Sequence, residues 1–136
     1  MSNNLNSVNS IYKAFGEGNI PFIIDQLAEN VQWEQWSENS AQAAGVPWLQ
    51  YGKGKEAALR YFQTIGALNF KEFNVLSVMG NDKQFAVEYA VEAEIPATGK
   101  SYRDEAIHLW TFNEEGKVSR MRHYTDTAKI IEANRK

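Results

Sequence analysis

The sequence contains no cysteine among its 136 residues. This absence excludes disulfide bonds, thiolate metal ligands and a cysteine nucleophile, and it fits a reducing compartment. The amino end, MSNNLNSVNS, has neither a positively charged segment nor an apolar one. No stretch approaches the ~20 mainly apolar residues that a membrane helix requires. We therefore expect a cytoplasmic protein with no membrane partner.

The chain also lacks runs of one charge. Its 14 Lys and Arg residues and 17 Asp and Glu residues are mixed along the sequence and give a formal net charge of −3. A nucleic-acid partner would require a basic stripe that neutralises phosphates, so none is expected. The length suits one domain with a substantial core and is too short for two ordinary domains. We expect a single domain over residues 1–136.

Three helices are predicted where apolar residues recur at helical spacing. They cover residues 4–17, 20–28 and 55–65. Asn19 is a suitable N-cap for the second helix, and Gly66 is a suitable end for the third. Each of these helices is expected to bury one apolar face.

Alternating apolar and polar residues predict strands in the remaining chain. Residues 31–36 form one short strand, and residues 70–126 form four long antiparallel strands separated by turn residues. Residues 37–50 have no sustained period and are predicted to be a loop suited to covering a pocket, and residues 127–136 a short, fraying helix. Helices followed by a long meander predict an α+β fold in which three N-terminal helices pack on a strongly curved, mainly antiparallel sheet.

This order of elements resembles the SnoaL-like branch of the NTF2-like superfamily. The motifs that carry the resemblance are Gly18-Asn19-Ile20, Gly52-Lys53-Gly54 and the ending RHYTD at residues 122–126. The resemblance implies a cone with a pocket between the concave face of the sheet and the helices, and a homodimer through the sheet. Family members include ketosteroid isomerases, polyketide cyclases, epoxide hydrolases and proteins without chemistry, so the fold alone does not define the reaction.

Neither of two catalytic sets of that superfamily is complete in this chain. The base of the ketosteroid isomerases corresponds to Gln35, which cannot accept a proton at neutral pH. Their oxyanion-hole tyrosine falls at or beside Ile11, with Tyr12 one residue further on, and their protonated acid corresponds to His108. The last-strand carboxylate of the epoxide hydrolases corresponds to His123, and their arginine–aspartate pair has no match at residues 88–92.

Strand parity places the two histidines on one face of the last hairpin. In the predicted register His108 faces Met121 and Ala106 faces His123, which leaves His123 diagonal to both Asp104 and His108. We predict that His123 is a base oriented by Asp104, and that His108 donates a hydrogen bond to a developing oxyanion. The alternative is that both histidines are polar lining held by neighbouring hydroxyl groups.

A mostly aromatic set of side chains is predicted to bind the ligand, with plain core packing as the alternative. This set is Tyr12, Trp33, Gln35, Tyr61, Phe62, Tyr89, Trp110 and Met121. Asp104 and His108 lie too far apart along one strand to share a metal ion, so we expect no metal and no cofactor. The sequence therefore predicts a cone that binds a small hydrophobic, ring-containing molecule, with isomerase-, cyclase- or hydrolase-type proton transfer. The alternative is a ligand-binding or dimerisation module without chemistry.

Overall fold

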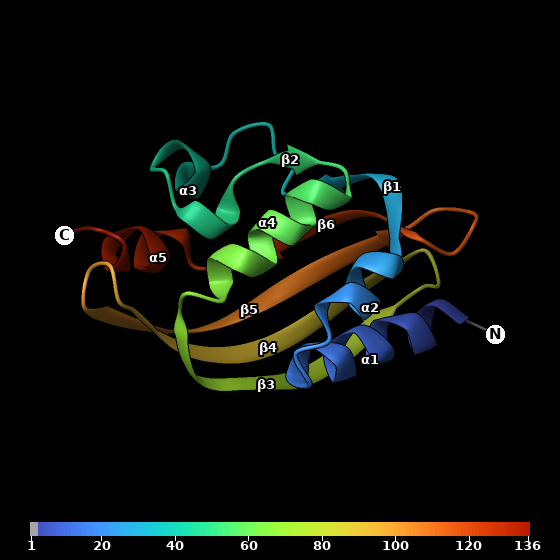
Figure 1. Cartoon of the computed structure of the whole chain (residues 1–136), viewed down its shortest axis with the longest axis horizontal. Coiled ribbons are helices and arrows are strands. Elements are labelled where there is room, and N and C mark those ends of the chain that lie inside the picture. The colour runs from blue at the N-terminus through green and yellow to red at the C-terminus, as the bar shows by residue number, and fades with distance from the viewer. Residues whose placement is uncertain (1–2) are drawn as a thin grey trace.

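The computed structural model describes residues 3–136. Helices, including the short 3-10 helix η1, and strands alternate in the first half of the chain, and long strands dominate the second half (Figure 1). In chain order the elements are α1 (Asn3–Gly16), α2 (Ile20–Asp25), β1 (Leu27–Trp33), α3 (Ser40–Ala43), η1 (Pro47–Leu49), β2 (Gly52–Lys53), α4 (Lys55–Ile65), β3 (Asn69–Gly80), β4 (Gln84–Ile95), β5 (Lys100–Phe112), β6 (Val118–Tyr124) and α5 (Thr127–Ala133).

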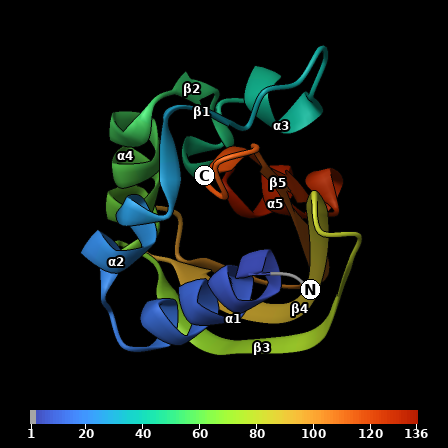
Figure 2. The same ribbon diagram turned by 90° about the vertical axis from the view of Figure 1, so that its right-hand side faces the viewer.

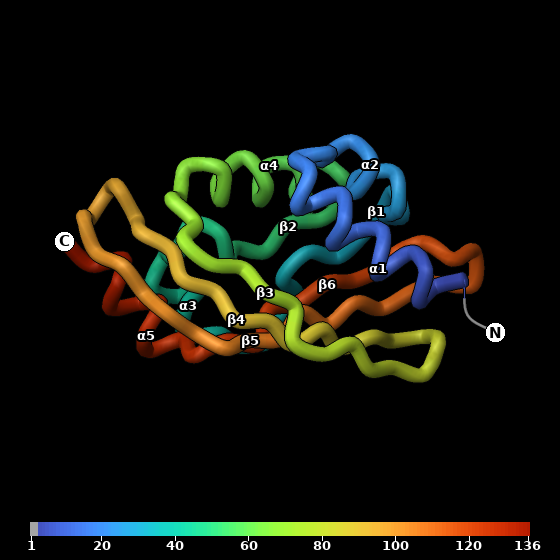
Figure 3. The backbone as a smooth tube through the Cα atoms, turned by 90° about the horizontal axis from the view of Figure 1, so that it is seen from below, coloured from blue at the N-terminus to red at the C-terminus, as the bar shows by residue number. Residues whose placement is uncertain are grey.

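All strands of the described chain join one sheet in the order β2-β1-β6-β5-β4-β3. Neighbouring strands are antiparallel except for β1 and β6, which pair in parallel. The sheet curls, and α1, α2 and α4 lie against its concave side (Figure 2). Seen from below, β3, β4 and β5 sweep across the molecule beside α1 (Figure 3). The predicted α+β cone with a curved, mainly antiparallel sheet is confirmed.

The first two helices follow from local sequence signals. Val8, Ile11 and Ala14 are spaced by a helical turn and form the buried face of α1. The side chain of Asn19 accepts a hydrogen bond from the backbone N–H of Phe22 and caps α2. The predicted second helix extended to residue 28, but α2 ends at Asp25 because the following residues enter β1.

The strand β1 is displaced from its predicted position. It begins at Leu27 and ends at Trp33, whereas alternation predicted residues 31–36. The strand stops because Glu34 has a left-handed backbone conformation, with φ of 59°. Such a conformation is uncommon for a residue other than glycine, and it removes Glu34 from the alternation of the strand.

The last hairpin has a different register from the predicted one. His108 lies opposite His123 and Trp110 lies opposite Met121, so β6 is shifted by two residues from the predicted pairing. An irregularity in the pairing between Thr111 and Phe112 accommodates the shift. Because the shift is even, every side chain keeps its predicted face.

Two connecting regions are more ordered than predicted. The segment after β1 contains α3 and η1, whose side chains Ala41, Trp48 and Leu49 are buried. The tail helix α5 buries Ile130 and Ala133, so the prediction of a fraying tail is wrong. Both regions pack near the same end of the cone (Figure 1). None of the described helices is long and apolar enough to cross a membrane.

Candidate functional site

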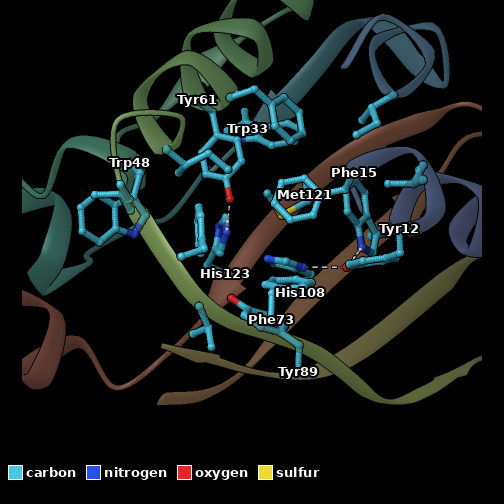
Figure 4. Close-up of a pocket in the computed structure, with 18 of the residues that line it drawn as sticks. Tyr12, Phe15, Trp33, Trp48, Tyr61, Phe73, Tyr89, His108, Met121 and His123 are labelled. Carbon is cyan, nitrogen blue, oxygen red and sulfur yellow. Dashed lines mark hydrogen bonds between the residues drawn. The ribbon is translucent and has the colours of Figure 1, made fainter. Parts of the chain in front are cut away.

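A cavity of about 60 Å³ lies between the concave face of the sheet and the helices. Aromatic side chains and the two histidines form most of its wall (Figure 4). A volume of this size has room for a few water molecules or a small ligand, whereas drug-sized ligands occupy pockets of about 300–1,000 Å³. The cavity in this structure is therefore smaller than a multi-ring ligand would require.

Most of the predicted ligand-binding residues meet at this cavity. Those that line it are Tyr12, Trp33, Tyr61, Phe62, Tyr89, Trp110 and Met121. Gln35 does not, because it is exposed and its backbone carbonyl accepts a hydrogen bond from Nε of Arg122, at 2.5 Å. The assignment of Gln35 to the pocket is wrong, since the left-handed turn at Glu34 carries the chain away from the cavity.

His108 is held by a chain of hydrogen bonds that begins at Trp110. Nε1 of Trp110 donates to the hydroxyl oxygen of Tyr12, at 2.8 Å. That oxygen lies 2.6 Å from Nδ1 of His108. Because the Tyr12 oxygen already accepts a hydrogen bond, we assign its own hydrogen to the bond with Nδ1. Neutral His108 then carries its proton on Nε2.

The environment of His108 favours its neutral form. Its side chain is buried, and burial together with the nearby His123 holds the pKa of His108 well below its ordinary value. Tyr89 stacks on the imidazole with a centroid separation of 4.1 Å. Within residues 3–136 no hydrogen bond reaches Nε2 of His108, so its N–H is available to a ligand.

His123 is bonded to a buried carboxylate. Its Nδ1 contacts Oε2 of Glu34, and its backbone N–H donates to Oε1 of the same residue at 3.2 Å. Nε1 of Trp36 also donates to Oε1, at 3.0 Å. Three N–H groups thus surround the Glu34 carboxylate, which has no exposed surface. A carboxylate accepts hydrogen bonds, so the proton of neutral His123 is on Nδ1 and its Nε2 is an acceptor.

Tyr61 connects His123 to the cavity. Its hydroxyl lies 3.0 Å from Nε2 of His123, and it donates its hydrogen to that nitrogen under the tautomer assigned above (Figure 4). Burial, and secondarily the charge of Glu34, hold the pKa of Tyr61 well above its ordinary value, so the isolated phenol stays protonated. The result is a hydrogen-bonded chain, Glu34–His123–Tyr61, that ends at the cavity wall.

Glu34 was not identified from the sequence. Strand alternation places residue 34 on the face opposite Trp33, away from the pocket. Its left-handed conformation instead turns the side chain toward β6, where its backbone N–H also bonds the carbonyl of Met121 at 2.9 Å. A buried residue in a sparsely populated conformation often marks a functional site. No sequence signal in residues 31–36 reveals that conformation.

Asp104 does not orient His123, contrary to the prediction. Its carboxylate accepts hydrogen bonds from the hydroxyl of Thr125 and from the backbone N–H groups of Glu105, at 2.9 Å, and Asp126, at 3.1 Å. Asp104 is buried but does not line the cavity. The two-residue shift of β6 moves His123 from its predicted position diagonal to Asp104 to the position opposite His108, and Thr125 stays within reach of Asp104. Asp104 therefore holds the junction between β6 and α5.

The two imidazole rings lie directly together at the cavity. Their centroids are 4.5 Å apart and their planes are nearly perpendicular, at 86°. One ring presents an N–H to the cavity and the other is linked to a carboxylate and a phenol. In the part of the chain described here, no group of three or more Asp, Glu or His side chains could hold a metal ion. The arrangement can donate a hydrogen bond to one ligand atom and exchange a proton with another.

Comparisons with known proteins match this fold. The family model described as a SnoaL-like domain matches residues 8–121. An NTF2-like protein of unknown function from Burkholderia pseudomallei gives a TM-score of 0.79, with 19% identity over 98% of each chain. An NTF2-like protein from Burkholderia thailandensis gives 0.81, with 16% identity over 100% of each chain. A candidate polyketide cyclase from Pseudomonas putida gives 0.72, with 19% identity over 98% of each chain.

At these identities the structural neighbours show the fold and not the reaction. A search of curated proteins found no match to this chain. The family model, in contrast, covers most of the sequence, from the middle of α1 to β6. The chain therefore belongs to the family of SnoaL-like domains.

Proposed function

We propose that this protein is a cofactor-free proton-transfer enzyme that acts on a small carbonyl compound. The observation that carries the proposal is the Glu34–His123–Tyr61 chain, which ends at a cavity where His108 presents an unpaired N–H. A base linked to an orienting carboxylate, beside a donor for a developing negative charge, is the arrangement that enolisation requires.

The proposed reaction begins with removal of a proton from the carbon next to the carbonyl group. That proton moves to the hydroxyl oxygen of Tyr61 while the hydroxyl hydrogen moves to Nε2 of His123. Glu34 stabilises the imidazolium that forms, and Nε2–H of His108 donates to the enolate oxygen. Because the pKa of Tyr61 is raised, the two transfers occur together, without a free phenolate. Return of the proton to another carbon gives isomerisation, and attack of the enolate on a second carbonyl gives cyclisation.

The size and lining of the cavity support a small, mainly apolar ligand. A cavity of about 60 Å³ with an aromatic wall accepts a short ketone more readily than a fused-ring compound. The polyketide cyclase designation of the Pseudomonas putida neighbour is compatible with enolate chemistry.

Hydrogen exchange tests the proposal without knowledge of the natural substrate. Butanone is incubated with the protein in D₂O, and loss of its α-hydrogen signal is followed by NMR. The wild-type protein should accelerate exchange above the buffer rate. Tyr61→Phe should lower the acceleration by a factor of about 10² or more, because it removes the relay oxygen. Tyr124→Phe is the matched control, since Tyr124 is exposed on the opposite face of β6. Equal exchange with and without the wild-type protein would contradict the proposal.

A ligand-binding module without chemistry is the second candidate function. It is favoured by the closure of the cavity, because Trp33, Trp48 and Trp110 all line it and all are buried. Such a module would raise its melting temperature in the presence of a ketone but would not exchange the α-hydrogens. The two measurements together separate binding from turnover.

We also propose that the protein forms a homodimer through the outer face of the sheet. The helices lie on the concave side and leave the outer face of β3, β4 and β5 uncovered (Figure 2). On β3, Met79 is half exposed, and Arg103 of β5 forms ion pairs with Glu72 and Glu92 across the sheet. Sedimentation equilibrium should give twice the monomer mass, and Met79→Glu should lower the association constant. A monomer at micromolar concentration would contradict this proposal.

A further inference from the structure

Tyr89 brings a hydroxyl group without a partner to the wall of the inner cavity. Its side chain lines that cavity, and only 5% of its surface is exposed. Within residues 3–136 no hydrogen bond involves this hydroxyl, whereas the hydroxyls of Tyr12 and Tyr61 are bonded to the two histidines. A buried hydroxyl without a partner is unfavourable unless a water molecule or a ligand meets it.

The Tyr89 hydroxyl opens to free space and is not sealed by neighbouring atoms. In the described part of the chain, the side-chain atoms that are both sealed from water and unpaired are Nε1 of Trp33 and Nε of Arg120. The Tyr89 hydroxyl is unpaired but is not one of these atoms. Because the hollow that Tyr89 lines is the inner cavity, we place the hydroxyl at the surface of that cavity.

This hydroxyl lies close to the N–H group that His108 presents. Tyr89 stacks on the imidazole of His108, with 4.1 Å between the ring centroids and 27° between the ring planes (Figure 4). The hydroxyl oxygen is one ring radius and one C–O bond from the centroid of its own ring, and Nε2 is on the rim of the imidazole. Both side chains line the same cavity. One small molecule with two acceptor atoms can therefore contact both groups.

The cavity offers no positive charge to an anionic ligand. Among the residues that the structure describes, no Asp, Glu, Lys or Arg side chain lines it. A carboxylate lies behind its wall, on Glu34, where it is bonded to His123. The surroundings of His108 favour its neutral form. An anionic group buried in the cavity would lack a partner of opposite charge, which is strongly unfavourable.

Tyr89 is a hydrogen-bond donor at neutral pH. Burial is the main cause that holds the pKa of its phenol well above the ordinary value, and the neighbouring phenols of Tyr61 and Tyr12 raise it further. The group therefore keeps its hydrogen. A carbonyl oxygen accepts that hydrogen without bringing an unpaired hydrogen of its own into the cavity.

We infer that Tyr89 binds a second carbonyl oxygen of the substrate, and that the substrate is a small neutral diketone. One carbonyl oxygen accepts from Nε2–H of His108, and the other accepts from the Tyr89 hydroxyl. This substrate class rests on the proposed proton-transfer function and adds to it a residue that selects among ketones. A diketone satisfies His108 and Tyr89 together, whereas a monoketone of the same length leaves one of them without a partner.

Matched ligands test the Tyr89 contact by NMR titration of the full-length protein. Hexane-2,5-dione and pentane-2,4-dione are each compared with the monoketone of the same length, hexan-2-one or pentan-2-one. The wild-type protein should bind at least one dione about fivefold more tightly than its monoketone, because of the added hydrogen bond. Levulinate and acetoacetate, in which a carboxylate replaces one acetyl group of these diones, should bind at least about tenfold more weakly than the dione that binds more tightly.

Two variants assign the contact to Tyr89. Tyr89→Phe removes the hydroxyl and keeps the ring that stacks on His108, so it should bind the dione and its monoketone within about twofold of each other. Its affinity for the monoketone should stay close to that of the wild type. Tyr102→Phe is the matched comparison, because Tyr102 is also buried and lines the cavity but lies six residues from His108 along β5. It should keep the preference for the dione.

Several outcomes would overturn this assignment. Equal binding of dione and monoketone by the wild-type protein would show that the Tyr89 hydroxyl bonds only water. A preference for the dione that survives Tyr89→Phe, or that is lost equally in Tyr102→Phe, would remove the contact from Tyr89. Keto acids that bind as tightly as the diones would overturn the neutral substrate class, and absence of binding by either dione would overturn both statements.

The chemistry and the substrate class can fail separately. Dione binding that depends on Tyr89, without accelerated exchange of the α-hydrogens, would support the Tyr89 contact and contradict the enzyme. Accelerated exchange of monoketones, with no preference for diones in binding, would support the enzyme and overturn the substrate class.

Discussion

The carboxylate of Glu34 contacts Nδ1 of His123, and both side chains are buried, with 0% and 6% of their surface exposed. The two residues are 89 positions apart in the sequence and meet because β1 pairs in parallel with β6. The pair orients the imidazole toward Tyr61 and the cavity. It is the feature of this protein that most resembles the base-and-orienter arrangement of acid–base catalysis.

Replacement of Glu34 by glutamine should weaken both the fold and the exchange activity. Glutamine keeps the shape of the side chain but replaces one acceptor oxygen with an NH₂ group, which faces N–H donors. We expect a loss of about 1–3 kcal/mol in the free energy of unfolding, measured by urea denaturation. Exposed Glu38 provides the control through Glu38→Gln, which should change stability by less than about 0.5 kcal/mol. Equal stability of the Glu34 and Glu38 variants would show that the buried pair contributes nothing.

Replacement of Asp104 by asparagine should affect stability and leave the chemistry intact. The carboxylate holds Thr125 and the backbone of Asp126, where α5 begins. Asparagine offers one acceptor oxygen where aspartate offers two, so we expect a cost of about 1–2 kcal/mol and faster amide hydrogen exchange in α5. Butanone exchange per folded molecule should stay unchanged. A large fall in the exchange rate would contradict this prediction and indicate that Asp104 takes part in the chemistry.

The stability of the protein should fall as the pH drops below about 6.5, the ordinary pKa of histidine. His108 has a lowered pKa in the folded state because it is buried and faces His123, so the unfolded chain binds a proton that the folded chain does not. Its contribution is present above the unfolded pKa and is lost as the pH falls toward the folded pKa. One such group gives a slope of at most about 1.4 kcal/mol per pH unit.

Comparison with His108→Gln isolates this contribution from those of other titrating groups. Urea denaturation of both proteins is measured from about pH 8 to about pH 5, where histidine is the side chain that ordinarily titrates. The wild-type protein should lose more stability on acidification than the variant. Parallel curves for the two proteins would indicate that His108 titrates normally in the folded state.

Gly52→Ala should destabilise the packing of α4 on β2. An added Cβ atom would lie 2.4 Å from Cβ of Ala57, which is closer than two carbon atoms can approach. We expect a cost of about 1–3 kcal/mol from the resulting shift of the helix, measured as a lower midpoint in urea. Gly16→Ala is the control, because nothing lies within 4 Å of an added Cβ at that position. A Gly52 variant as stable as this control would contradict the close packing.

Much of the fold could be predicted because its signals are local. The apolar spacing of α4 and the alternation of β3 to β6 follow directly from helix and strand geometry. For the same reason, the prediction that His108 and Trp110 lie on the pocket-facing side of β5 was correct. A register shift of two residues keeps each side chain on the same face of the sheet. The predicted faces of β5 and β6 were therefore correct, although the predicted residue pairs between them were wrong.

The rest of the site depends on features that the sequence does not reveal. The irregular pairing near Thr111 moved His123 opposite His108 and left Asp104 with Thr125. The left-handed turn at Glu34 directs its carboxylate toward His123, whereas strand alternation predicted that this side chain faces away from the pocket. A register shift and a single backbone dihedral are set by tertiary packing, and neither has a distinctive residue pattern here.

The cavity holds two imidazoles with opposite tautomers: His108 donates from Nε2 toward the cavity, and His123 is bonded through Nδ1 to Glu34 and through Nε2 to Tyr61, and the proposed function rests on this difference. Long-range ¹⁵N–¹H NMR of the imidazole rings at neutral pH tests it most directly. We expect a proton on Nε2 of His108 and on Nδ1 of His123, with the His123 pattern altered in Glu34→Gln. A proton on Nδ1 of His108, or the same tautomer in both rings, would contradict the proposed function.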